Sequence, residues 1–221
     1  MAHHAEQVEY APDTRQITAH TKKKTYRAAE QDTPHIQAQR EAYQEKMRTI
    51  EPHDYVFLDE TGVNIAMARH YARALQGERA YASKPVNKGH NITVLGALSL
   101  DGIIAAMTVD GSSDTQVFFT YVQTVVVPNL RPGQVVMMDN LSSHHNDRLQ
   151  TAIEAVGATL EYLPPYSPDF SPIEKCWSKL KEILRAKAAR TRDTLDAAIT
   201  TAFTMITPQD ARGWFAHCGY L

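Results

Sequence analysis

Three acidic residues next to apolar segments give this chain its clearest chemical signal. Asp59 closes the apolar run YVFL, and Asp139 closes the apolar run VVMM. Glu174 follows Asp139 after 34 intervening residues (140–173), at the end of the segment PPYSPDFSPIE. Carboxylates at strand ends and at the start of a helix can converge in a fold. The pattern therefore predicts a site for divalent cations.

Carboxylate oxygens are the ligands that Mg²⁺ and Mn²⁺ prefer. Two such ions about 4 Å apart can activate a water or a 3′-hydroxyl and stabilise the leaving oxygen of a phosphodiester. No side-chain nucleophile is then needed, so the three acids favour a metal-dependent nuclease. Taken singly, each acid has a plainer interpretation as a turn, cap or first-turn residue. A glycosidase built on an Asp/Glu pair is a second enzyme class, and it would need no metal.

Apolar periodicity and turn residues predict the elements that position these acids. Strands are expected at 55–58, 91–100, 103–109, 135–138 and 159–163, with a hairpin turn at 101–102. Helices are expected at 34–47, 114–127 (capped by Asp114), 145–156, 172–190, 193–206 and 208–216. This order predicts an α/β fold, in which three antiparallel strands and then alternating α and β elements form a mixed sheet. Helices should cover both faces, with extra helices at the C-terminus.

In such a sheet the first and fourth strands can be neighbours. Asp59 and Asp139 would then emerge together at the same edge of the sheet. Four prolines in the segment 164–172 stiffen the loop that leads to Glu174, because each proline fixes its backbone φ angle. The loop should therefore deliver Glu174 at a set angle, in the first turn of the following helix.

Composition and charge bound the class of protein. With 221 residues, 43% hydrophobic and 22% charged, the chain has the composition of an ordinary globular protein. Its formal net charge of -2 means that any nucleic-acid surface must be local. The two cysteines, Cys176 and Cys218, form no CxxC pattern, which argues against a disulfide framework or a zinc site. No apolar run is long enough for a membrane span and no signal-peptide pattern begins the chain, so a soluble intracellular protein without membrane contact is expected.

Residues 1–50 differ from the rest of the chain. They are polar, carry a basic cluster at 22–24, and contain few large aliphatic residues. We interpret them as a basic, polar arm and a linker helix that lies on the main domain, with a solvated disordered arm as the alternative. The expected division is therefore 1–50 for the arm and linker helix and 51–221 for the catalytic domain.

Three segments resemble the catalytic domain of the DDE transposases, in the bacterial insertion-sequence branch of the mariner superfamily. They are FLDET at 57–61, MDNLSSH at 138–144 and LPPYSPDFSPIE at 163–174, and the 34-residue gap is the spacing of that branch. The resemblance runs from about Lys22 to the C-terminus. It implies a ribonuclease-H-like fold, and it implies that Asp59, Asp139 and Glu174 are the catalytic triad that binds Mg²⁺ or Mn²⁺, with two ions expected.

The resemblance also implies cleavage of DNA at transposon ends and strand transfer into target DNA, typically at a TA dinucleotide. The expected partners are transposon-end and target DNA and further copies of the chain, because two ends must be held together. Full-length relatives carry helix-turn-helix modules before the catalytic domain, and none is readable in residues 1–50. We therefore expect a product of a split reading frame or a truncated copy, in the bacterial cytoplasm at the nucleoid. A separately encoded helix-turn-helix protein could recognise the ends; the alternative is a non-catalytic remnant that associates with DNA or oligomerises.

Basic residues near the third acid are candidates for contacts to DNA phosphates. Lys175 and Lys179 lie nearest Glu174 on the predicted helix, although a solvated helix face explains them equally well. Lys84 and Lys88, in the connection before the second strand, are placed to approach DNA by position alone. Trp177, on the same helix as Glu174, is expected in the core.

Overall fold

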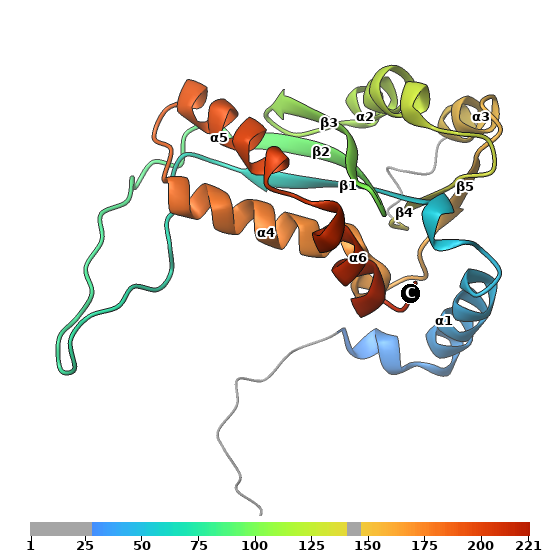
Figure 1. Ribbon diagram of the computed structural model, residues 1–221, viewed down its shortest axis with the longest axis horizontal. Coiled ribbons are helices and arrows are strands. Elements are labelled where there is room, and N and C mark those ends of the chain that lie inside the picture. The colour runs from blue at the N-terminus through green and yellow to red at the C-terminus, as the bar shows by residue number, and fades with distance from the viewer. Residues whose placement is uncertain (1–27, 141–146) are drawn as a thin grey trace, which may run out of the picture.

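The computed structural model describes residues 28–140 and 147–221 (Figure 1). Its strands are β1 (Tyr55–Val63), β2 (Ile92–Ser99), β3 (Gly102–Asp110), β4 (Val135–Met138) and β5 (Thr159–Tyr162). They form one sheet in the order β3-β2-β1-β4-β5. β1, β2 and β3 pair antiparallel, whereas β1, β4 and β5 run parallel. The predicted mixed sheet is confirmed.

Two hydrophobic cores lie on opposite faces of this sheet. One face is covered by α4 (Pro172–Lys187), α5 (Arg192–Thr204) and α6 (Pro208–His217), the other by α2 (Thr115–Tyr121) and α3 (Asp147–Glu154) (Figure 1). Alternate residues of β1 enter alternate cores: Tyr55 and Phe57 join the core under α4–α6, and Val56 and Leu58 join the other. Because side chains alternate along a strand, Asp59 points to the side of α4.

β1 is longer than predicted. The sequence DETG after Leu58 resembles a turn, yet residues 59–63 continue the strand and pair with β2, with Asp59 opposite Gly96. Pairing of β1 with β4 ends earlier, at Phe57 and Met137. Asp59 therefore lies within β1 rather than at its end, two residues beyond the last residue of β1 that pairs with β4.

The predicted helix at 114–127 is regular only in its first part. Asp114 caps it as predicted, since its carboxylate accepts a hydrogen bond from the Val117 N–H at 2.8 Å. The regular helix α2 ends at Tyr121 and continues as a π turn (Val122–Val126) and a 3-10 turn (Val127–Asn129). Pro128 explains the change, because proline has no N–H to donate to the preceding turn and its ring clashes with the carbonyl four residues back.

The remaining helices follow the prediction closely. α1 (Pro34–Met47) has the predicted bounds, and it lies beside the C-terminus (Figure 1). The helix predicted at 145–156 begins outside the described residues, and its described part is α3. α4 ends at Lys187, three residues before the predicted end at residue 190. The next residue, Ala188, adopts a left-handed conformation with a φ angle of 49°. Among the helices of the described ranges, none is long and apolar enough to cross a membrane.

Candidate active site

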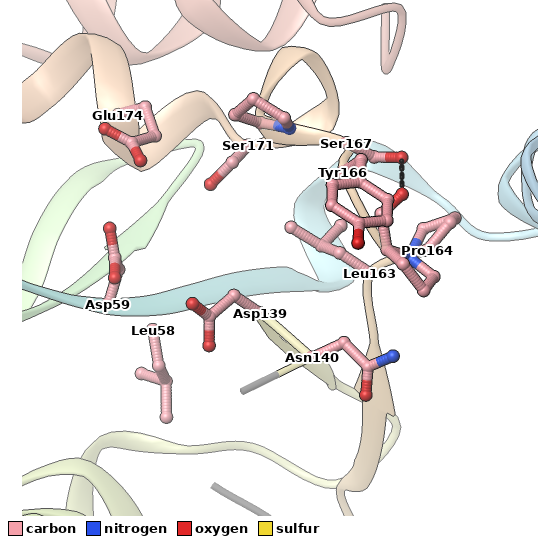
Figure 2. A pocket seen from close by; sticks show the side chains of 12 residues that line it. Leu58, Asp59, Asp139, Asn140, Leu163, Pro164, Tyr166, Ser167, Ser171 and Glu174 are labelled. Carbon is pink, nitrogen blue, oxygen red and sulfur yellow. Dashed lines mark hydrogen bonds between the residues drawn. The ribbon is translucent and has the colours of Figure 1, made fainter. Parts of the chain in front are cut away.

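The three predicted acids line one cavity of about 480 Å³ (Figure 2). Asp59 comes from β1, Asp139 directly follows β4, and Glu174 lies in the first turn of α4. Parallel pairing sets the first two side by side, because each lies two residues beyond the pair Phe57 and Met137. Figure 2 shows the three carboxylates facing a common space. The acids thus converge from three separate elements, as the sequence predicts.

The wall of the cavity is formed by the proline-rich loop 163–171 and by the chain after β4. Leu163, Tyr166 and Ser171 contribute from the loop. Asn140 also lines the cavity, but its side chain points away from the three carboxylates in Figure 2. His144, which follows Asp139 in the sequence, lies outside the described residues.

Asp59 has a strongly raised pKa. Burial of its carboxyl group, together with the negative charges of Glu174 and Asp139, raises its pKa to about 7. Hydrogen bonds from the backbone of Glu60 and from Trp177 oppose this rise. A divalent cation would relieve both causes, because it compensates for lost hydration and cancels the repulsion between carboxylates.

The donor set fits Mg²⁺ or Mn²⁺ in its chemistry, since it consists of hard carboxylate oxygens that face one cavity. In the described part of the chain, no group of three or more His, Cys, Asp or Glu side chains lies close enough to hold one ion together. The three acids therefore offer suitable ligands from three elements without being gathered around a single point.

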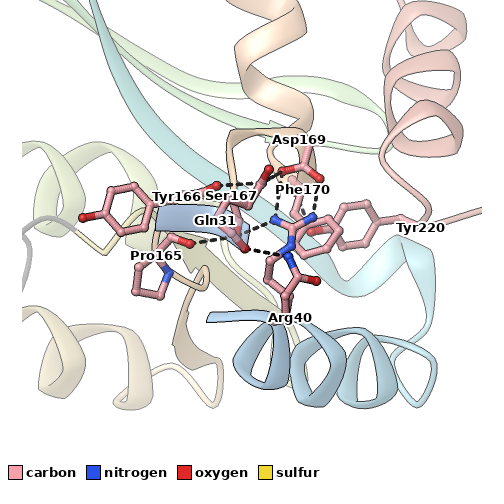
Figure 3. Close-up of polar contacts among 9 residues, drawn as sticks. Gln31, Arg40, Pro165, Tyr166, Ser167, Asp169, Phe170 and Tyr220 are labelled. Carbon is pink, nitrogen blue, oxygen red and sulfur yellow. Dashed lines mark hydrogen bonds and ion pairs between the residues drawn. The ribbon is translucent and has the colours of Figure 1, made fainter. Parts of the chain in front are cut away.

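The loop that carries the cavity wall is held by α1 and the short helix before it (Figure 3). Arg40 of α1 donates to both carboxylate oxygens of Asp169, at 3.0 and 2.6 Å, and to the hydroxyl of Ser167 at 2.7 Å. Its guanidinium carbon also lies 4.2 Å from the centre of the Phe170 ring. Burial alone would raise the pKa of Asp169, but the hydrogen bonds and charge of Arg40 lower it below its usual value.

A second contact fixes the conformation of the same loop. Tyr166 has a φ angle of 57°, which is uncommon for a residue other than glycine. Gln31 donates from Nε2 to the Tyr166 carbonyl at 2.9 Å and is itself buried. Sequence reasoning missed both Gln31 and Arg40, because their partners lie more than 120 residues away along the chain.

The two lysines predicted to contact DNA differ in their surroundings. Lys175 is exposed beside Glu174. The ammonium of Lys179 pairs with Asp210 at 2.5 Å, and Asp210 also accepts the capping hydrogen bonds of Thr207 at the start of α6. A phosphate would have to compete with this ion pair for Lys179, so contact with DNA stays a prediction for both residues.

A second hollow of about 560 Å³ lies between α4 and the long connection from β1 to β2. The basic side chains that line it are Arg69, His70, Lys84, Lys88, Lys181 and Arg185. None of the lining residues that the structure describes is acidic. The connection is anchored by Arg190, in the segment between α4 and α5, which donates to the carbonyls of Ile65 and Met67 at 2.9 Å.

The sequence of the chain matches the model of a protein family. The family model of the DDE superfamily endonucleases matches residues 54–196, which include all three acids. The chain belongs to the DDE superfamily endonuclease family. A comparison with curated proteins finds no match.

Structures of the Mos1 mariner transposase are among the solved structures that resemble this chain. A pre-cleavage Mos1 transpososome has a TM-score of 0.72 and 13% sequence identity, over 91% of this chain and 64% of that one. A Mos1 paired-end complex with Mg has a TM-score of 0.68 and 15% identity, over 92% and 64% of the two chains. The isolated catalytic domain of Mos1 matches with a TM-score of 0.59 and 11% identity, over 82% and 85%. At these identities the likeness shows a shared ribonuclease-H-like fold, and the chain spans 64% of the Mos1 chain in these two complexes.

Proposed function

We propose that this chain cleaves DNA phosphodiesters with divalent metal ions, as the catalytic part of a transposase. The observation that carries the proposal is the convergence of Asp59, Asp139 and Glu174 on one cavity from β1, from the end of β4 and from α4. Membership of the DDE superfamily endonucleases supports the same chemistry. Structures of Mos1 paired-end complexes with Mg and with Mn support the choice of metal.

Each of the three acids has a distinct position in the proposed reaction. Asp59 and Asp139 stand side by side on the sheet and would hold metal between them, and Glu174 would close the site from α4. Two Mg²⁺ or Mn²⁺ ions, when bound, would supply an activated water or 3′-hydroxyl and would stabilise the leaving oxygen. The protein itself would fix the ligands, since Asp59 lies within β1, Asp139 directly follows β4, and Glu174 follows a loop held by Arg40 and Gln31.

The test is nicking of supercoiled plasmid by the purified chain with Mg²⁺ or Mn²⁺, and with EDTA. We expect nicking that requires the metal and falls by at least about a hundredfold in Asp139→Asn, because the variant loses a charged ligand. Asp101→Asn is the matched control, since Asp101 is an exposed acid at the β2–β3 turn. Nicking that persists in EDTA or in Asp139→Asn would refute the assignment. A folded chain that nicks in neither metal would favour a non-catalytic remnant.

We further propose cutting at transposon ends and strand transfer, which the Mos1 paired-end and strand transfer complexes support, and a TA target, which the resemblance to the mariner superfamily implies. The partners would be transposon-end and target DNA and further copies of the chain. A helix-turn-helix module, encoded separately or in a longer chain, would recognise the ends, with residues 1–50 as the connecting arm and 51–221 as the catalytic domain. Sequencing of junctions formed in vitro between a donor end and a target plasmid tests the TA preference. Junctions spread over all dinucleotides would refute that preference.

The basic hollow beside α4 would receive the DNA backbone. Its position next to the helix that carries Glu174 supports this role, as does the absence of acidic residues among those that the structure describes there. Lys175 would add a phosphate contact closer to the cavity.

A further inference from the structure

Trp177 lies behind the candidate metal site rather than in it. It follows Glu174 by three residues on α4, is 2% exposed, and is not among the residues that line the cavity. Its indole Nε1–H donates a hydrogen bond to Oδ2 of Asp59 at 2.9 Å. Trp177 thus lies on α4, the helix that carries the proposed metal ligand Glu174, and is hydrogen-bonded to a second proposed ligand, Asp59, on β1.

The sheet provides a slot for this indole ring. Gly96 of β2 is the register partner of Asp59. A Cβ atom on Gly96 would lie 2.5 Å from Cη2 of Trp177, closer than carbon atoms approach, and 3.2 Å from Cζ2, tighter than most carbon contacts. Glycine in a strand interior often marks such a close approach. The missing side chain leaves room for the ring beside the sheet, with its N–H directed at Asp59.

The chemistry of the indole suits a residue that orients a metal ligand. An indole N–H is a donor only, so it can hold a carboxylate oxygen but can neither bind a cation nor accept a proton. The bond to Oδ2 fixes the rotation of the Asp59 carboxylate about its side chain. Because Trp177 and Glu174 share one face of α4, the same bond also sets the distance between the helix and β1. One contact therefore constrains two ligands.

We propose that Trp177 is a positioning residue for the metal site, holding the Asp59 carboxylate and the start of α4 in the arrangement that binds the ions. The proposal rests on the proposed metal-dependent function of Asp59, Asp139 and Glu174. The alternative is that Asp59 merely satisfies the N–H of a buried tryptophan. The two differ in what happens to metal affinity when the donor is removed and the ring is kept.

The experiment replaces the Trp177 indole N–H by sulfur. The chain has two tryptophans, so incorporation of 3-benzothienylalanine in a Trp214→Phe background changes Trp177 alone. This analogue keeps the ring size and lacks the donor. Affinity for Mn²⁺ is measured from the electron paramagnetic resonance signal of free Mn²⁺, and binding that persists in Asp139→Asn is subtracted. The reference is the Trp214→Phe protein that contains ordinary tryptophan.

We expect the protein that contains the analogue to bind Mn²⁺ about tenfold more weakly than the reference protein. Loss of a residue that orients a metal ligand typically lowers metal affinity by about 10- to 100-fold, and this value is the lower end of that range. Cooperative thermal unfolding of both proteins without metal shows that each is folded. Equal affinity in the two proteins would overturn the positioning role and leave the metal-dependent function standing. If the reference protein shows no Mn²⁺ binding that depends on Asp139, the proposed function is overturned, and this inference with it. That result is obtained before Trp177 is altered, so the two failures are distinguishable.

A second measurement needs no substitution at Trp177. In the ¹⁵N-labelled chain the two indole N–H signals are assigned with the Trp214→Phe variant. Saturation with Mg²⁺ should shift the Trp177 signal, because its acceptor becomes a metal ligand, and should leave the Trp214 signal in place. A Trp177 signal that is unmoved by saturating Mg²⁺ would overturn the proposal, even if the analogue-containing protein fails to fold.

Discussion

Substitution of Gly96 by alanine tests whether the slot under Trp177 is as tight as the structure indicates. The new Cβ would lie 2.5 Å from Cη2 of Trp177, about 1 Å inside normal carbon contact. The ring cannot rotate away freely, because it is 2% exposed and is held by Asp59. Overpacking of this kind costs about 1–3 kcal/mol, and alanine in place of glycine in a strand returns about 0.5–1 kcal/mol. The midpoints of these two ranges differ by about 1.25 kcal/mol, so the net loss should be about 1–2 kcal/mol.

For a chain of this length each kcal/mol corresponds to about 2–4 °C in melting temperature, so Gly96→Ala should melt about 2–8 °C below the wild type. The assay is thermal unfolding followed by circular dichroism, in EDTA so that metal binding does not contribute. Gly62→Ala is the matched control. Gly62 lies in β1 within the same strand pair, and a Cβ there would meet nothing within 4 Å. The control should melt at or slightly above the wild-type temperature.

A double-mutant cycle with Trp177→Phe assigns the loss to the ring. Phenylalanine is shorter than tryptophan, so Gly96→Ala should cost less in that background, with a coupling of about 1 kcal/mol. The reasoning fails if Gly96→Ala melts within about 1 °C of the wild type, or if the two substitutions are additive. Either result would mean that the ring is free to move, and the close packing behind Asp59 would have no basis.

Three further outcomes follow from the charges around the site. The folded-state pKa of Asp59 is raised from 3.8 to about 7, so the stability from its protonated form is complete below pH 3.8 and is lost as pH rises through about 7. Asp59→Asn should therefore stabilise the EDTA-treated chain by roughly 2 kcal/mol more at pH 8 than at pH 5, as measured by urea unfolding. An equal gain in stability at both pH values would contradict the raised pKa. Arg40→Ala should cost about 1–3 kcal/mol, because the side chain is 14% exposed and also packs over an aromatic ring. The pKa of Asp169 is lowered from 3.8, so the stability that its ion pair with Arg40 contributes is present above that pH and is lost below it. In thermal scans, the loss of stability in Arg40→Ala should therefore shrink below pH 3.8. A loss that stays constant with pH would rule out the ion pair as its source. Lys175→Ala should reduce the slope of log DNA affinity against log salt concentration by about 1. Lys179→Ala should reduce this slope less, because Lys179 already pairs with Asp210. The reverse order would show that the ion pair of Lys179 and Asp210 breaks when DNA binds.

The acids and most elements were predictable because they depend on local patterns. The run VVMM is a short apolar strand bounded by Pro132-Gly133 and Asp139, and β4 begins and ends where that pattern predicts. The end of β1 was not predictable in the same way. Asp59 and Gly62 are poor strand residues, and only the ladder with β2 extends the strand through them. Neighbouring strands therefore decided where Asp59 lies within its element.

The contacts that fix the site were out of reach of local patterns. Trp177 was correctly predicted in the core, and Gly96 within a strand could have signalled a close approach. That these two residues meet over Asp59 depends on how α4 crosses β1 and β2, which joins positions 118 residues apart. The bond between Arg40 and Asp169 likewise joins positions 129 residues apart.

The segment that carries Glu174 is held on both sides of the acid. Before it, Arg40 and Gln31 fix the loop through Asp169 and the Tyr166 carbonyl. After it, Trp177 is bonded to Asp59 and wedged against the sheet. A carboxylate in the first turn of a helix has little choice of position when the turn before it and the turn after it are both anchored. The geometry of the three acids is therefore set by residues that never face the cavity, and variants of those residues are the ones that separate positioning from chemistry.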